Sequence, residues 1–319
     1  DFMSDSPKQP VRFVSVLAEE AGQRLDNFLL RHAGDVPKTR IYRAIRKGEV
    51  RVNKGRSKAD YRVKAEDSVR VPPLTVVPRE VSKQPSAAWE KRIRSAIMYD
   101  DNELLVINKP TGLAVHGGSG VRLGLIESLR SLLPDERYLE LVHRLDRDTS
   151  GLVMIAKNAR TLRSLHQQLR ENRIHKRYMA LVAGKWPAYQ RMVSAPLDRR
   201  HTASGERLVK VSNEGKPAKT EMRVLERFPD ATLIEAKPIS GRTHQIRVHT
   251  QHIGHPILGD TKYQNDQSAS RTSAIGLKRL FLHATAIQFE LNNQRYDLSC
   301  PLDPELESVL DKLRTERKA

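Results

Sequence analysis

The residues best suited to chemistry form a run of alternating charge, HRLDRD at 143–148, followed by Thr-Ser-Gly. Apolar residues precede this run and the strand-like LVMIA follows at 152–156, so we expect a loop between two buried elements. Polar side chains on such a loop face a cleft or the solvent. In a cleft, Asp146 could act as a nucleophile or a general base. On these residues alone, a salt-bridged solvent loop is an equal alternative.

A second alternative treats Asp146 and Asp148 as a pair of catalytic carboxylates. Two residues apart on a short loop, they could approach the ~5 Å separation found in retaining glycoside hydrolases. Sugar-binding sites usually also present aromatic platforms, and aromatic residues make up only 5% of this chain. The composition therefore disfavours a glycoside hydrolase.

A second polar segment, PISGRTHQIRVHTQHIGHPILGD, occupies 238–260. Thr243 is placed to cap a helix over 243–253. A carboxylate acting as nucleophile or base must stay ionised, and an arginine partner helps to keep it so in a partly buried site. This segment is therefore the candidate source of an arginine for Asp146.

The same segment contains four histidines, His244, His249, His252 and His255. His249 and His252 lie three residues apart on one helical face, a spacing that metal sites can use. No acidic or cysteine ligand joins them in this pattern, so we expect no metal.

A third segment, HKRYMALV at 175–182, begins a strand. Tyr178 offers a ring that can stack on a nucleic-acid base, worth about 1–3 kcal/mol, and a hydroxyl that can form hydrogen bonds. On spacing alone, a tyrosine in a strand more often serves packing.

Taken together, the strings VHRLDRDTSGL, GRTHQIRVH and the K-x-Y pattern resemble the motifs of the RluA-type pseudouridine synthases. The resemblance implies that Asp146 is the catalytic aspartate and that Arg144 enters the RNA when the target base leaves it. It also implies that Arg242 pairs with Asp146 and that Tyr178 stacks on the base. Ile246 is a weaker candidate, for the apolar residue beneath the uracil.

The implied reaction isomerises uridine to pseudouridine. It breaks the bond from C1′ to N1 and joins C1′ to C5 without net redox change or an added group, so no cofactor is expected. An RNA-binding assembly factor with an inactive catalytic domain is an alternative, but the intact set of Asp146, Tyr178 and Arg242 argues against it.

The elements expected to position these residues are mostly short strands. Apolar runs of strand length occur at 103–108, 152–156, 178–184, 220–227 and 231–236. Helical patterns are fewer, at 122–133, 158–171, 243–253 and from about 304, and the polar stretch 264–276 reads as a mobile surface loop. This mixture predicts an α+β fold with a large mixed, mainly antiparallel sheet.

The N-terminal part reads as a separate small module. Its apolar residues recur at helical spacing, first Leu25, Phe28 and Leu29 and then Ile41, Ala44 and Ile45. Short strands are expected at 50–52 and 68–71, around the turn NKG. The pattern from RLDNFLL to PKTRIYRAIRKGEVRVNKGR resembles an S4 RNA-binding domain. We expect this small αβ domain at 11–75, a linker at 76–92 and the catalytic domain at 93–319, after a remnant at 1–10.

Charge points to the partner. The chain carries a net charge of +18 over 319 residues, and surplus lysine and arginine usually meet phosphate. Between Lys38 and Lys64, eleven basic residues face two acidic ones, which makes a net nine positive charges. The residues expected to contact RNA phosphates in this module are Arg40, Arg43, Arg46, Lys47 and Arg51.

The S4-like module and the motif VHGGSG resemble the branch of the family that modifies 23S ribosomal RNA. The substrate could be this RNA by itself or the RNA within a large-subunit particle. No apolar run approaches the ~18 residues of a membrane helix. A single cysteine, Cys300, permits no internal disulfide and suits a reducing cytoplasm. We expect a cytoplasmic protein without a membrane partner, and a monomer.

Overall fold

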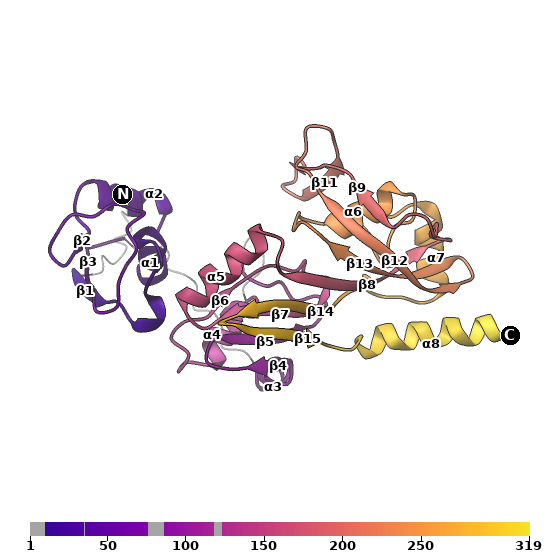
Figure 1. The fold of residues 1–319 in the computed structure, drawn as a ribbon, viewed down its shortest axis with the longest axis horizontal. Helices are drawn as coiled ribbons and strands as arrows, with labels where there is room; N and C mark the ends of the chain where they lie inside the picture. The colour runs from indigo at the N-terminus through magenta and orange to yellow at the C-terminus, as the bar shows by residue number, and fades with distance from the viewer. Residues whose placement is uncertain (1–9, 35, 76–85, 118–122) are drawn as a thin grey trace, which may run out of the picture.

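The computed structural model describes residues 10–34, 36–75, 86–117 and 123–319, which form a small N-terminal module and a larger sheet-based part (Figure 1). Residues 1–9 of the expected N-terminal remnant and residues 76–85 of the expected linker lie outside the described residues. Each part has its own hydrophobic core, because the core of the N-terminal module runs from Val16 to Leu74 and shares no residue with the others.

The N-terminal module packs two helices against a small antiparallel sheet of order β1-β3-β2. Its elements are β1 (Arg12–Ser15), η1 (Ala18–Glu20), α1 (Leu25–His32), α2 (Lys38–Arg46), β2 (Arg51–Val52) and β3 (Ser68–Val71). Both expected helices and both expected strands are present. Asn53 and Lys54 have φ of 48° and 70°, the left-handed conformation that a tight turn between strands requires.

The larger part is built on a ten-stranded sheet in which β4-β5-β7-β14-β8-β13-β12-β9 form a continuous path, with β15 paired to β14 and β6 to β7. Its strands are β4 (Ile97–Asp100), β5 (Leu104–Lys109), β6 (Glu140–Leu141), β7 (Ser150–Ala156), β8 (His175–Ala183), β9 (Met192–Ser194), β12 (Lys219–Phe228), β13 (Ala231–Pro238), β14 (Leu282–Leu291) and β15 (Gln294–Ser299). Only β7 and β14 pair in parallel among these strands. The expected α+β fold with a mainly antiparallel sheet is confirmed.

Alternating side chains place apolar surface on both faces of this sheet. Leu105, Ile107 and Val153 belong to one core cluster, whereas their strand neighbours Leu104 and Leu152 belong to another. Successive residues of a strand point to opposite faces, so β5 and β7 bury both. Helices α3 (Ala87–Ser95) and α4 (Leu125–Leu132) cover the first face, and α5 (Ala159–Arg170) covers the second.

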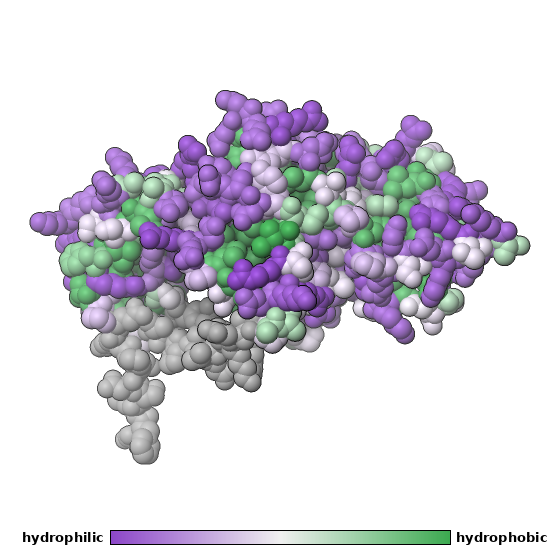
Figure 2. Space-filling model, turned by 90° about the horizontal axis from the view of Figure 1, so that it is seen from below, coloured by the Kyte–Doolittle hydropathy of each residue, from purple (hydrophilic) through white to green (hydrophobic). Residues whose placement is uncertain are grey.

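A two-stranded hairpin of β10 (Leu197–His201) and β11 (Arg207–Val211) stands beside the main sheet near α6 (Gln245–His252), as Figure 1 shows. The C-terminal helix α8 (Pro304–Lys318) was expected, and Asp303 caps it by accepting a hydrogen bond from the Leu306 amide at 3.1 Å. Figure 2 shows that hydrophilic side chains cover most of the face seen from below, with hydrophobic patches between them.

Two expectations about irregular structure are wrong. Residues 266–274 of the expected mobile loop form helix α7 (Asp266–Ala274), whose first turn is closed by reciprocal hydrogen bonds between Asn265 and Ser268. Such capping satisfies the free backbone amides of the first turn, so polar residues that otherwise favour loops can begin a helix. Residues 87–92 of the expected linker belong to α3, which Ser86 caps and Ile93 anchors in the core. Among the described residues, no helix is long and apolar enough to cross a membrane.

Candidate active site

The loop that carries Asp146 is fastened by the turn that follows β5. Lys109 Nζ and the Gly112 amide both donate to the carbonyl oxygen of Arg147 at 2.9 Å, and Thr111 Oγ1 donates to that of Asp148 at 2.8 Å. Lys109 is fully buried, and burial lowers its pKa to about 7 despite the opposing charge of Asp148. These bonds hold the backbone on the C-terminal side of Asp146, so its carboxylate has a defined direction.

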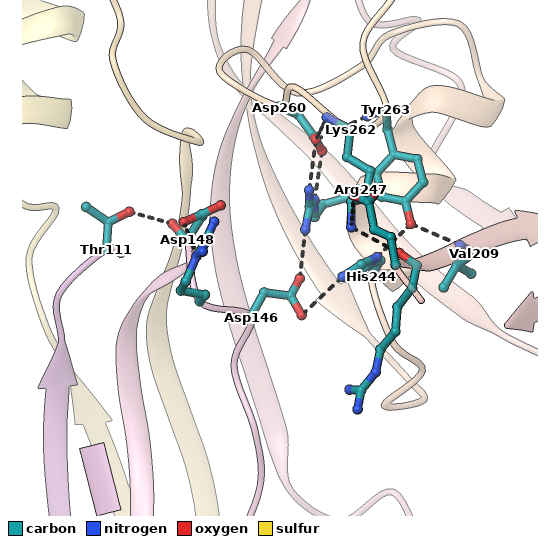
Figure 3. A network of polar contacts seen from close by, with 12 residues as sticks. Thr111, Asp146, Asp148, Val209, His244, Arg247, Asp260, Lys262 and Tyr263 are labelled. Carbon is teal, nitrogen blue, oxygen red and sulfur yellow. Dashed lines mark hydrogen bonds and ion pairs between the residues drawn. The ribbon is translucent and has the colours of Figure 1, made fainter. Parts of the chain in front are cut away.

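The carboxylate of Asp146 points toward helix α6, where Arg247 meets it (Figure 3). Arg247 Nη1 lies 3.3 Å from Asp146 Oδ2. The same guanidinium donates two hydrogen bonds to Asp260, at 2.8 and 2.9 Å. Arg247 therefore bridges two carboxylates, of which Asp260 has a fully buried side chain and Asp146 is 28% exposed.

The electrostatics of this bridge favour a permanently charged arginine. Burial works against the charge of Arg247, but the hydrogen bonds and charge of Asp260, joined by Asp146, raise its pKa above the ordinary value. A two-point contact with Asp260 also holds the guanidinium plane in one orientation. Asp260 thus positions Arg247, and Arg247 presents a fixed positive charge to Asp146.

A second neighbour of Asp146 is His244, the residue at which α6 begins. His244 has φ of 53°, an uncommon left-handed conformation for a residue other than glycine. Its Nε2 lies 3.7 Å from Asp146 Oδ1, and its Nδ1 lies 2.6 Å from the Tyr263 hydroxyl. Burial lowers the pKa of His244, so the ring is neutral near pH 7. When the Tyr263 hydroxyl donates to Nδ1 of His244, the ring proton of His244 lies on Nε2, the nitrogen that faces Asp146.

In the structure, the arginine that contacts Asp146 is Arg247 and not Arg242. The expected pairing of Arg242 with Asp146 is therefore corrected. Arg242 is exposed, and its Nε donates to the Pro217 carbonyl at 3.3 Å. The physical reason is helical geometry: Arg242 precedes the helix, whereas Arg247 lies within it and is buried between Ile246 and Val248. Sequence reasoning missed Arg247, although an arginine within a buried helical run signals a buried acidic partner.

Tyr178 and Ile246 belong to the core cluster that also contains Leu145, the residue before Asp146. Tyr178 is 7% exposed in β8, and burial, with a contribution from the charge of Asp146, raises the pKa of its phenol. Ile246 is 5% exposed in the same core cluster as Tyr178. Both side chains are therefore largely packed in the core, and the Tyr178 phenol stays protonated.

Arg144 is exposed and faces the hairpin of β10 and β11. Burial lowers its pKa, and the nearby guanidiniums of Arg207 and Arg199 lower it further. Three positive charges thus gather around Arg144, an arrangement that a polyanion would neutralise. The sequence did not identify Arg199 and Arg207, because no motif in the β10–β11 segment indicates that this hairpin lies next to Arg144.

The five basic residues expected to bind RNA in the N-terminal module differ in how far their charges are free. Arg43, Arg46 and Lys47 are exposed. Arg40 is half-buried and pairs with Glu49 at 2.8 Å, and Arg51 donates to the Gly48 carbonyl at 2.8 Å. Three of the five therefore keep fully accessible charges, and two are braced against the fold.

The histidines of 244–255 do not form a metal site in the described part of the chain, where no group of three or more His, Cys, Asp or Glu residues is arranged to hold an ion. His249 Nδ1 lies 2.8 Å from the Thr220 hydroxyl, and Nε2 lies 2.9 Å from the Ala195 carbonyl. Both ring nitrogens of His249 are thus engaged in packing α6 against the sheet.

Two sequence profiles match the chain. The S4 domain matches residues 23–69, and the family described as RNA pseudouridylate synthase matches residues 103–252, which includes Asp146, Tyr178 and Arg247. The matched regions correspond to the N-terminal module and to much of the sheet-based part.

Curated relatives match almost end to end. "Ribosomal large subunit pseudouridine synthase C" of Pasteurella multocida (strain Pm70) is 49% identical over 314 residues, covering 98% of this chain and 96% of that protein. The protein of the same name from Escherichia coli (strain K12) is 50% identical over 313 residues, covering 96% of this chain and 98% of that protein.

Solved structures resemble the larger part. Human RNA Pseudouridylate Synthase Domain Containing 4 is 27% identical with a TM-score of 0.59, covering 71% of this chain and 96% of that one. Human RNA Pseudouridylate Synthase Domain Containing 1 is 26% identical with a TM-score of 0.57, covering 70% and 94%. The chain therefore belongs to the RNA pseudouridine synthase family, as an RluA-type isomerase with an N-terminal S4 domain.

Proposed function

We propose that this protein isomerises specific uridines of 23S ribosomal RNA to pseudouridine, with Asp146 as the catalytic carboxylate and without a cofactor. The observation that carries the proposal is the Asp146–Arg247–Asp260 bridge, which holds the partly exposed carboxylate of Asp146 beside a fixed positive charge. Relatives about 50% identical over nearly the whole chain are named for the large ribosomal subunit, which supports that substrate.

In this proposal, Asp146 acts on the ribose of the extruded uridine, as a nucleophile at C1′ or as a base at C2′. The bond from C1′ to N1 breaks, the uracil turns, C1′ joins C5, and the proton on C5 leaves while N1 gains one. Arg247 keeps a positive charge beside the Asp146 carboxylate before and after these steps. The balance needs no oxidant, reductant or transferred group.

The surrounding residues bind the base and the backbone. Tyr178 stacks on the uracil, and because its phenol stays protonated it serves as a hydrogen-bond donor and not as a base. Ile246 supplies an apolar surface beneath the ring. Arg144 fills the space that the base vacates, which offsets the few kcal/mol needed to extrude it. Arg242, exposed and near this site, is proposed to act in the reaction through the RNA and not through Asp146.

We further propose that the exposed basic residues of the N-terminal module bind phosphates of the same RNA, and that the protein acts as a monomer in the cytoplasm. The net charge of +18 supports a polyanionic partner.

The test compares the wild-type protein with Asp146→Asn on 23S rRNA labelled with tritium at C5 of uridine. We expect tritium release from the wild type and none above background from the variant, whose RNA binding should persist. Release at the wild-type rate by Asp146→Asn would remove Asp146 from the catalytic role. Release from other RNAs but not from 23S rRNA would refute the proposed substrate alone.

A further inference from the structure

A cleft of about 950 Å³ separates the N-terminal module from the sheet-based part. One wall comes from α1 and the turns around it, the other from α5 and the residues around β6, and Figure 1 shows α1 and α5 on either side. The cleft is distinct from the Asp146 site, because neither Asp146 nor any residue of α6 lines it.

The walls of the cleft are strongly basic. Six arginines line it and only one acidic residue, Glu140, does so; the arginines are Arg24, Arg31, Arg62, Arg130, Arg163 and Arg170. Such an excess of one charge in a concave surface focuses a positive potential on whatever enters.

Half of these arginines already have acidic partners. Arg31 and Arg130 both pair with Glu140, at 2.9 and 3.1 Å, and Arg24 pairs with Asp26 at 2.8 Å. With Glu20 4.0 Å from Arg31 as a further partner, these pairs brace the walls and leave little net charge at their positions.

The other three arginines carry the excess positive charge of the cleft. Within the described residues, no carboxylate lies within ion-pair distance of Arg62, Arg163 or Arg170, and all three are exposed. Arg62 and Arg163 approach from opposite walls and both donate to the Gly22 carbonyl, at 3.2 and 2.8 Å. Their remaining donors are available to an anion in the cleft, since a guanidinium has five.

The cleft also adjoins the segment that leads into the catalytic loop. Glu140 and Leu141 line it and lead directly into the loop that carries Asp146. On the same wall, His166 of α5 forms a hydrogen bond of 3.0 Å with the Val142 carbonyl, at the start of that loop. A strand held in the cleft is therefore anchored to the same segment that positions Asp146.

We propose that this cleft is a second RNA-binding site, in which Arg62, Arg163 and Arg170 hold backbone phosphates of the rRNA whose uridine enters the Asp146 site. The inference rests on the proposed function and adds to it a path for the substrate between the two parts of the chain. RNA is favoured over an acidic protein because the walls lead into the loop that acts on RNA.

The first experiment removes the three charges together, as Arg62→Gln, Arg163→Gln and Arg170→Gln. Affinity for a 23S rRNA fragment should weaken, and the slope of log affinity against log salt should become shallower by roughly 2 to 3, since each phosphate contact contributes about 0.7–0.9. The turnover number at saturating RNA should stay within about twofold of the wild type. The matched control neutralises three exposed lysines and arginines that do not line the cleft, Arg295, Lys312 and Lys318.

Equal salt slopes for the cleft variant and the control variant would overturn the proposal. The comparison also separates it from the proposed function, because a wild type that binds rRNA with the steep slope yet makes no pseudouridine would refute the catalytic assignment and leave the cleft in place.

The second experiment needs no change of charge. Asn27 is exposed and lines the cleft, whereas Gln294 lies on the turn between β14 and β15; the native Cys300 is only 5% exposed and should not react. The rRNA fragment should slow maleimide labelling of Asn27→Cys at least tenfold and leave Gln294→Cys unaffected. Equal labelling with and without RNA, or stronger protection by polyglutamate than by RNA at the same salt, would overturn the proposal.

Discussion

Replacing Arg247 by methionine tests the charge bridge most directly. Methionine keeps much of the length and apolar stem of the side chain and removes only the guanidinium. In the wild type, that group forms the 2.8 and 2.9 Å hydrogen bonds to Asp260 and lies 3.3 Å from Asp146. Its loss leaves the fully buried carboxylate of Asp260 without a cationic partner, with only the backbone amides of Lys262 and Tyr263 as donors, and removes the contact that orients Asp146.

The expected loss of stability follows from the burial of Arg247 and Asp260. Removing one partner of a buried ion pair typically destabilises a protein by about 3–5 kcal/mol, and Arg247 and Asp260 are both buried. The double variant Arg247→Met with Asp260→Asn removes both charges, so it should recover about 2 kcal/mol or more of that loss. Urea unfolding of the two single variants, the double variant and the wild type measures this coupling.

Activity should not recover together with stability. The double variant still lacks the positive charge beside Asp146, so its turnover should stay at least ~100-fold below wild type while its affinity for RNA changes little. The matched control is Arg242→Ala, which removes an exposed arginine of the same segment. It should retain its stability and lose affinity for RNA before it loses turnover.

The opposite pattern would refute the reasoning. If Arg242→Ala abolished turnover with unchanged RNA affinity while Arg247→Met turned over normally, Arg242 would be the partner of Asp146 in the active protein. Equal stability of Arg247→Met and wild type would show that the bridge to Asp260 contributes nothing to the fold.

Two further predictions concern the strands behind the catalytic loop. Burial lowers the pKa of His283 to about 4 from the 6.5 of an unfolded chain, so unfolding takes up a proton between these values. The free energy of unfolding should fall as the pH drops from 6.5 through 4, by up to roughly 3 kcal/mol, and His283→Asn should flatten this dependence in urea titrations; an equal slope would contradict the assignment. Gly151 has φ of 114°, and an added Cβ would lie 2.3 Å from the Ala284 carbonyl oxygen. Gly151→Ala should therefore cost roughly 2 kcal/mol or more, whereas Gly276→Ala, with nothing within 4 Å, should cost about 1 kcal/mol; similar midpoints of thermal unfolding would refute the close-approach argument.

The sequence by itself determined the class of the fold and the elements that alternate in hydrophobicity. Strands such as β7 and β13 were expected because each is an apolar run of strand length, and α2 was expected because Ile41, Ala44 and Ile45 repeat at helical spacing. These signals are local, so neighbouring residues suffice to read them. Helix α7 was missed because its stability comes from capping bonds of polar residues and not from an apolar stripe.

The candidate site was likewise predicted only in part by the sequence. The long motifs marked Asp146, Tyr178 and the segment of α6 from the sequence, since their residue types and order are specific. Which arginine meets Asp146 was decided only by the tertiary structure, because it depends on the direction in which α6 presents Arg247 and on the buried position of Asp260. The grouping of Arg144 with Arg199 and Arg207, and the basic cleft beside α5, likewise depend on contacts between segments far apart in the chain. Electrostatic interactions act through space, so sequence separation does not reveal them.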